Sequence, residues 1–108
     1  MSADLHVTLC TVPDETTAGQ IADTLVSEKL AACVNIIPSI VSVYRWKDNV
    51  EHSQELLLLI KSSTSVWPLL EKRIRELHPY ELPEIIAVPI QTGHADYTQW
   101  IKDNLISL

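Results

Sequence analysis

The pattern of apolar and polar residues is strongest between Val34 and Thr64, where it predicts two long strands joined by a turn at Asp48-Asn49. Most residues before the turn are β-branched or aromatic, the types that suit a pleated surface. The run Leu56–Ile60 after the turn is entirely apolar, as in a strand covered on both faces. A two-residue turn pairs Lys47 with Val50, Tyr44 with Ser53 and Val41 with Leu56, and it gathers five side chains on one face: Tyr44, Trp46, Glu51, Ser53 and Glu55.

This hairpin is too long for a domain of 108 residues. From Asn35 to Lys47 an extended strand spans roughly 40 Å, whereas a chain of this length folds into a body in the mid-thirties of Å across, with a radius of gyration of about 13 Å. The end that carries Tyr44 and Trp46 should therefore overhang the domain. One interpretation is a bent hairpin with a bulge at Pro38 and a solvated tip. We favour the other, in which a second copy of the chain covers the aromatic overhang.

Before the hairpin the pattern predicts a strand and a helix. Leu5 to Val12 is rich in apolar and β-branched residues and forms the predicted strand. Either Asp14 or Thr16 is placed to cap the helix that follows. Apolar residues recur along one face of this helix: Ala18, Ile21, Ala22, Leu25, Val26 and Leu30.

After the hairpin the pattern predicts a helix, a strand and a final helix. The first of these has Pro68 in its opening turn and stops at His78-Pro79, because a residue before proline avoids the α region. Its inward residues are Leu70, Ile74 and Leu77. The segment 84–91 predicts a buried strand with Pro89 at a bulge or an edge. The segment 95–105 predicts a short helix that buries Tyr97, Trp100 or Ile101.

The resulting order is β-α-β-β-α-β followed by an extra helix, which is typical of the ferredoxin-like α+β fold with an antiparallel sheet. We expect a single domain over residues 1–108. The net charge of −6 disfavours nucleic acid and anionic membranes as partners, and no apolar run is long enough to span a membrane. The first residues lack a cationic leader region, and the two cysteines are too few for a disulfide scaffold. These features indicate a reducing cytoplasm.

The candidate chemistry is confined to Cys10 and to the segment His78–Glu84. No glycine-rich phosphate loop and no standard zinc or nucleophile motif occurs. Cys10 is placed on a strand, where a buried apolar role is common, and His78 is placed to cap a helix. We expect Cys33 in the core and the other histidines on the surface: His6, His52 and His94.

Several motifs together resemble the CutA family of divalent-cation tolerance proteins. They are residues 9–15 (LCTVPDE), 29–35 (KLAACVN), 42–46 (SVYRW), 78–84 (HPYELPE) and the closing Tyr97 and Trp100. The resemblance implies a cytoplasmic homotrimer similar in architecture to the PII signalling proteins. It also implies binding of copper or other divalent cations, with Cys10 and His78 as ligands. Some members carry a second histidine where this chain has Leu77.

Two further interpretations concern the residues around the proposed trimer clefts. Tyr44 and Trp46 are placed to line an intersubunit cleft with Lys61, Tyr80 and Glu84. This favours, as an alternative function, a PII-like signalling or scaffold protein that binds a small ligand or partner protein. An enzyme with Cys10 as nucleophile, His78 as base and Glu84 as its orienting group ranks below a binding protein, since no oxyanion hole is evident. We therefore predict no enzymatic activity.

Overall fold

The computed structural model describes residues 4–108. Within this range the chain forms four strands and three helices, in the order β1 (Leu5–Val12), α1 (Glu15–Ser27), β2 (Cys33–Trp46), β3 (Asn49–Ser63), α2 (Trp67–Leu77), β4 (Ile86–Pro89) and α3 (Ala95–Asp103). The predicted lack of a leader region concerns the first residues and lies partly outside the described range.

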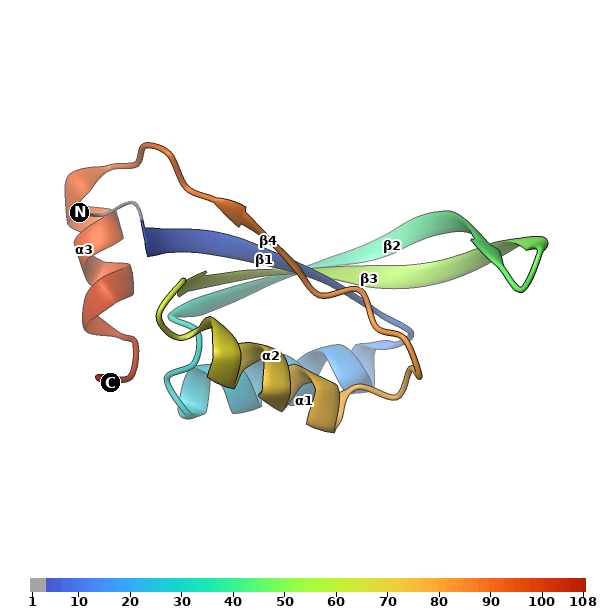
Figure 1. Cartoon of the computed structure of the whole chain (residues 1–108), viewed down its shortest axis with the longest axis horizontal. Helices are drawn as coiled ribbons and strands as arrows, with labels where there is room; N and C mark the ends of the chain where they lie inside the picture. The colour runs from blue at the N-terminus through green and yellow to red at the C-terminus, as the bar shows by residue number, and fades with distance from the viewer. Residues whose placement is uncertain (1–3) are drawn as a thin grey trace.

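The strands form one antiparallel sheet in the order β2-β3-β1-β4. Helices α1 and α2 lie side by side across one face of this sheet, and α3 stands at the end of the sheet away from the hairpin tip (Figure 1). The predicted ferredoxin-like arrangement with an extra C-terminal helix is confirmed.

The core lies between the two helices and the sheet. Apolar residues recur along one face of each helix at the helical period, and they alternate along the strands, so that the helices and the sheet present apolar faces to each other. Ile21 on α1 and Ile74 on α2 are fully buried, and they meet the even-numbered strand residues, among them Cys10 and Leu58. The Asp14 carboxylate caps α1 by accepting a hydrogen bond from the Thr17 N–H at 2.8 Å, as predicted. This cap fixes where α1 begins, directly after the end of β1.

The turn of the β2–β3 hairpin is one residue earlier than predicted. Lys47 and Asp48 occupy its centre with φ of 50° and 70°, and Trp46 pairs with Asn49. Tyr44 therefore pairs with Glu51 rather than with Ser53. Moving a turn by one residue changes each pairing by two positions, so the predicted face survives intact. It still holds Tyr44, Trp46, Glu51, Ser53 and Glu55.

The hairpin both bends and overhangs. The register of β2 and β3 shifts between Ile37 and Ile40, so Pro38 and Ser39 form the bulge that was the alternative interpretation. Ser39 has a φ of 62°, which turns the strand locally. The molecule is 44 Å long, and the far end of the hairpin projects beyond the helices (Figure 1).

The last strand and the last helix differ from the prediction. Strand β4 is exposed along its whole length instead of buried, because it pairs with β1 alone and forms an edge of the sheet. Pro89 suits this edge position, as predicted. Helix α3 is two residues shorter than predicted and buries Ile101, while Tyr97 and Trp100 stack on each other and stay exposed.

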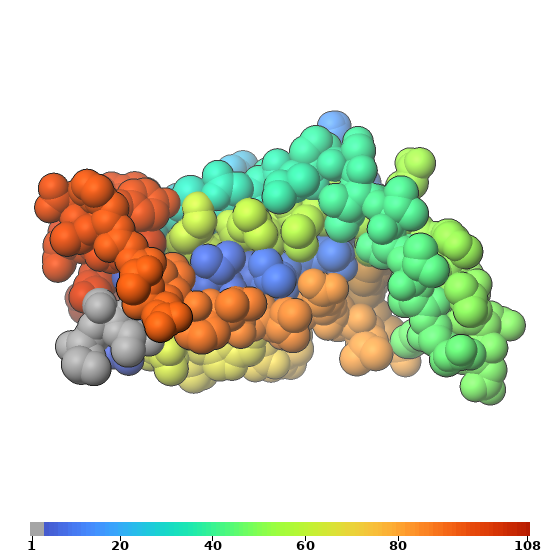
Figure 2. All heavy atoms as spheres, turned by 90° about the horizontal axis from the view of Figure 1, so that it is seen from above, coloured from blue at the N-terminus to red at the C-terminus, as the bar shows by residue number. Residues whose placement is uncertain are grey.

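The face of the sheet opposite the helices is open, with the four strands uncovered side by side (Figure 2). The prediction that the run Leu56–Ile60 is covered on both faces is wrong within one chain. Its even-numbered residues are buried under the helices, but Leu57 and Leu59 on the other face are only half-buried. Neighbouring strands add more aliphatic side chains to this open face: Val7, Leu9, Ile37, Ile86 and Val88.

Candidate functional site

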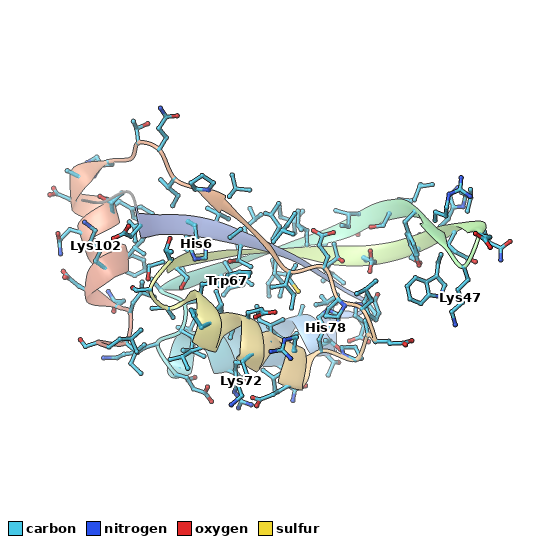
Figure 3. The ribbon with its side chains drawn as sticks, in the orientation of Figure 1. His6, Lys47, Trp67, Lys72, His78 and Lys102 are labelled. Atoms are coloured by element: carbon cyan, nitrogen blue, oxygen red, sulfur yellow. The ribbon has the colours of Figure 1, made fainter. Side chains whose placement is uncertain are left out.

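Cys10 and His78, which are far apart in the sequence, meet at one backbone carbonyl oxygen. The chain leaves α2 at His78 and passes the end of β1, where the His78 Nε2 lies 2.8 Å from the Thr11 carbonyl oxygen. The Cys10 Sγ points to the same oxygen from 3.8 Å. The antiparallel sheet and the end of α2 therefore bring both predicted ligands to one place; Figure 3 shows His78 at this end of α2.

The hydrogen bonds of His78 determine its tautomer. Since a carbonyl oxygen only accepts, Nε2 carries the proton and donates it to the Thr11 carbonyl. Nδ1 accepts a hydrogen bond from the Tyr80 backbone N–H at 3.1 Å. His78 as a whole is 8% exposed, and its ring also packs against the Tyr80 ring, with 4.7 Å between the ring centroids. Both ring nitrogens are thus engaged, and a metal ion would have to replace one of these partners.

The Cys10 thiol is completely buried. Burial, and then the negative charges of Glu84 and Glu55, raise the pKa of this thiol to about 12. The thiol is therefore protonated at neutral pH. The same two carboxylates create a negative potential at the sulfur, which would favour a cation beside it. Such a cation would in turn lower the pKa of the thiol.

The other predicted residues occupy different surroundings. Among residues 4–108 no group of three or more His, Cys, Asp or Glu side chains is arranged to hold a metal ion. His6 is buried rather than on the surface, near Trp67 and at the end of α2 away from His78 (Figure 3). Burial lowers the pKa of His6. His52 and His94 are exposed, as predicted, and His94 caps α3.

Cys33 is half-buried on the open face rather than in the core. It pairs with Lys61, whose Nζ lies 3.9 Å from the Cys33 Sγ and also donates to the Asn35 side-chain carbonyl. Lys61 therefore lies with Cys33 and Asn35, apart from the other residues of the predicted cleft.

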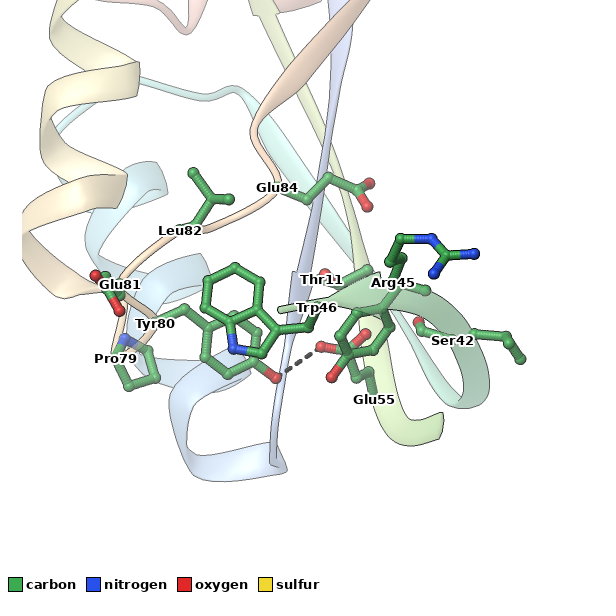
Figure 4. Close-up of a pocket in the computed structure, with 12 residues that line it drawn as sticks. Thr11, Ser42, Arg45, Trp46, Glu55, Pro79, Tyr80, Glu81, Leu82 and Glu84 are labelled. Carbon is green, nitrogen blue, oxygen red and sulfur yellow. Dashed lines mark hydrogen bonds between the residues drawn. The ribbon is translucent and has the colours of Figure 1, made fainter. Parts of the chain in front are cut away.

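The remaining cleft residues line one cavity of about 730 Å³ between the bent hairpin and the segment after α2 (Figure 4). Tyr44 and Trp46 line it from β2, and Tyr80 and Glu84 line it from the segment that follows His78. The bend at Pro38 and Ser39 redirects the outer part of the hairpin, so one chain contributes both walls. Its volume falls in the range of small-molecule sites, about 300–1,000 Å³.

A buried carboxylate lies in the wall of this cavity. Glu55 is 6% exposed, and its Oε2 accepts a hydrogen bond of 2.6 Å from the Tyr80 hydroxyl. Within the described residues no basic side chain forms an ion pair with Glu55. Burial, together with this bond and the charge of Glu55, raises the pKa of Tyr80. The carboxylate is therefore held by one neutral donor and keeps its remaining oxygen for a further partner.

Sequence reasoning missed Glu55 as a site residue, together with Thr11 and Arg45. One signal for Glu55 was present in the pattern. It is a charged residue immediately before an apolar run, on the same strand face as Tyr44 and Trp46. An acidic residue on an aromatic face beside a buried strand favours a site residue over a solvated one.

Comparisons with known proteins agree with the motifs. The family described as CutA1 divalent ion tolerance protein matches residues 6–104. The divalent-cation tolerance protein CutA of Thermus thermophilus is 51% identical over 99 residues, which are 92% of this chain and 96% of the relative.

Solved structures agree as well. The structure of the divalent cation tolerance protein of T. thermophilus has a TM-score of 0.92 at 50% identity, covering 94% of this chain and 98% of that chain. A protein of Archaeoglobus fulgidus, described as a periplasmic divalent cation tolerance protein, has a TM-score of 0.90 at 31% identity and covers 93% and 97% of the two chains.

Proposed function

The chain belongs to the CutA1 divalent ion tolerance family, and from this premise we propose that it binds divalent metal ions and so serves divalent-cation tolerance. We propose copper as the main ion, with other divalent cations bound as well, because thiolate and imidazole ligands suit copper and zinc. The proposed ligands are Cys10 and His78.

The observation that carries this proposal is the convergence of Cys10 and His78 on the Thr11 carbonyl, close to two carboxylates that favour a cation. Binding requires the ring of His78 to leave Thr11 or Tyr80 and requires the thiol to lose its proton. Glu84 then acts on the bound ion through its charge, which in the metal-free protein contributes to the raised pKa of the Cys10 thiol. Solvent or a second copy of the chain completes the coordination.

Titration with Cu²⁺ and with Zn²⁺ tests the proposal. The wild type should bind one ion per chain, and the double variant Cys10→Ala, His78→Ala should lose this binding. The matched control is His52→Ala, which removes an exposed histidine from β3 and should bind like the wild type. Equal binding by the wild type and the double variant would instead assign the metal to surface groups.

The same contacts favour a binding role over catalysis. A nucleophilic cysteine needs a lowered pKa and a base that accepts its proton. The pKa of Cys10 is raised to about 12. The Nε2 of His78 carries a proton that it donates to the Thr11 carbonyl. In this arrangement the imidazole cannot take a proton from the thiol through Nε2.

We further propose that the protein is a homotrimer with PII-like architecture. The open aliphatic face of the sheet and the projecting hairpin are surfaces that a lone domain rarely leaves bare. The sheet also has unpaired edges at β2 and β4, and closed symmetry satisfies such edges without forming fibres. The number of three subunits rests on the resemblance to the family.

For location we propose the cytoplasm, since Cys10 and Cys33 are both free thiols, as suits a reducing compartment. The A. fulgidus relative is described as periplasmic, so fractionation of the native host decides between the two compartments. In the described part of the chain, no helix is both long and apolar enough to cross a membrane.

A second candidate function is PII-like signalling or scaffolding through a small ligand. The observation that favours it is the cavity lined by Tyr44, Trp46, Tyr80 and Glu84. This function is compatible with metal binding, because Cys10 and His78 do not line the cavity, although Glu55 and Glu84 in its wall act on the thiol through their charges.

A further inference from the structure

We propose that the cavity between the bent hairpin and the segment after α2 binds an organic cation of the alkylammonium type, with the Glu55 carboxylate as the partner of its ammonium group. This site goes beyond the proposed metal function and does not depend on it. Four observations carry the proposal: the buried carboxylate of Glu55, the negative charge of the side chains that line the cavity, the aromatic rings among them and the size of the cavity.

The buried charge of Glu55 is the first observation. A carboxylate that is 6% exposed loses most of its hydration, and it is stable when a cation or several donors replace the water. In the described chain Glu55 has one neutral donor, the Tyr80 hydroxyl, and forms no ion pair. Figure 4 shows this carboxylate in the wall of the cavity beside the Tyr80 hydroxyl. An ammonium group in the cavity would supply the missing counter-charge.

The sign of the lining is the second observation. Three carboxylates, those of Glu55, Glu81 and Glu84, line the cavity against the single guanidinium of Arg45. Glu81, Glu84 and Arg45 are all exposed, so water screens their charges more than it screens the charge of Glu55. The cavity therefore favours a cation over an anion such as a phosphate group.

The aromatic lining is the third observation. The rings of Tyr44, Trp46 and Tyr80 surround the space beside Glu55. A ring face attracts an ammonium group and also packs against the methylene groups of an alkyl chain. Trp46 already attracts a cation of this chain, since the Lys47 Nζ lies 5.6 Å from its ring centroid. Rings combined with carboxylates suit an organic ammonium ion better than a hydrated metal ion.

The size of the cavity is the fourth observation. At about 730 Å³ it is far larger than a bare metal ion needs, and its carboxylates form no cluster arranged to hold one within residues 4–108. An extended polyamine can place one ammonium at Glu55 and another toward Glu84, with its methylene groups against the rings. The chemical class that fits is therefore a small aliphatic polyamine.

Calorimetric titration with spermidine, at about 0.15 M salt to suppress general attraction to an acidic protein, tests the proposal. The wild type should bind one spermidine per chain, and 1,8-octanediol, an uncharged chain of similar length, should not bind. Glu55→Gln keeps an acceptor for the Tyr80 hydroxyl but removes the charge, and should weaken binding by about tenfold or more. The matched control is Asp23→Asn, which removes one exposed carboxylate of α1 outside the cavity and should leave binding unchanged.

A second measurement needs no change in the core. In a ¹⁵N spectrum of the wild type, spermidine should shift the indole N–H signal of Trp46 and leave that of Trp100 on α3 in place. Trp46→Leu should weaken binding by about threefold to tenfold, with the mass of the assembly in sedimentation equilibrium unchanged.

The absence of spermidine binding would overturn the proposal, and so would equal weakening by Glu55→Gln and Asp23→Asn. The variant Cys10→Ala, which removes a thiol that does not line the cavity, should lose the metal ion and still bind spermidine. Failure of the metal site and failure of the polyamine site are therefore distinguishable.

Discussion

At the scale of single residues, the environment of Cys10 controls how a metal ion can bind. The thiol is buried on the helix-covered face of β1, and its nearest acceptor is the carbonyl of the next residue. Because its pKa is raised to about 12, a metal ion must displace a proton that is firmly held at neutral pH. A site of this kind gains affinity as the solution becomes more alkaline.

The apparent affinity for zinc should therefore rise by about tenfold for each pH unit between about pH 6 and pH 8, one proton being released per ion bound. The sign follows from the thiol, which is protonated throughout this range, so that a lower proton concentration favours the metal-bound thiolate. Competition titrations with a chromophoric chelator measure this slope. The Cys10→Ala variant should lose most of the dependence, and a flat profile in the wild type would show that the thiolate is not a ligand.

At the scale of elements, the hairpin shows what the sequence can predict. The strands and helices were predicted largely correctly, because each depends on a local period of apolar residues. The face shared by Tyr44, Trp46 and Glu55 was predicted correctly, because side chains alternate between the two faces of a strand and a turn displaced by one residue leaves this alternation unchanged. The turn was misplaced by one residue, since Asp48-Asn49 and Lys47-Asp48 both include residues that tolerate positive φ.

The observed turn gives a prediction for hairpin stability. Lys47 and Asp48 both adopt positive φ, which asparagine and glycine adopt at lower cost. The double variant Lys47→Asn, Asp48→Gly should therefore raise the free energy of unfolding by about 1 kcal/mol. The control Asn49→Gly places a flexible residue at the first position of β3 and should lower it. Denaturant unfolding at fixed protein concentration compares the three chains, and stabilisation by Asn49→Gly alone would place the turn where the sequence had predicted it.

At the scale of the whole molecule, the errors of sequence reasoning share one cause. His6 is buried and Cys33 is half-exposed because burial depends on which face of the sheet the helices cover. The local sequence pattern of a strand does not show which of its two faces this will be. The cavity at Glu55 requires the bend at Pro38 to redirect the hairpin beside the segment after α2. The meeting of Cys10 and His78 likewise exists only in the folded chain.

Assembly can be tested at the same scale. Sedimentation equilibrium at micromolar concentration should give three times the chain mass of 12.1 kDa, since interfaces over the open face and the hairpin should bury well over ~1,000 Å². Removal of residues 45–51 should yield monomers or insoluble protein, while the turn variant Lys47→Asn, Asp48→Gly should keep the mass of the intact assembly. A mass of 12.1 kDa for the intact chain would contradict the proposed trimer.

The central claim is that a divalent ion binds to the Cys10 thiolate beside His78. X-ray absorption at the zinc edge tests it most directly, because sulfur differs from nitrogen and oxygen in both scattering and bond length. With one equivalent of zinc, the wild type should show a sulfur neighbour at about 2.3 Å and nitrogen or oxygen neighbours at about 2.0–2.2 Å, and Cys10→Ala should lose the sulfur. A wild-type spectrum with nitrogen and oxygen neighbours alone would contradict the claim.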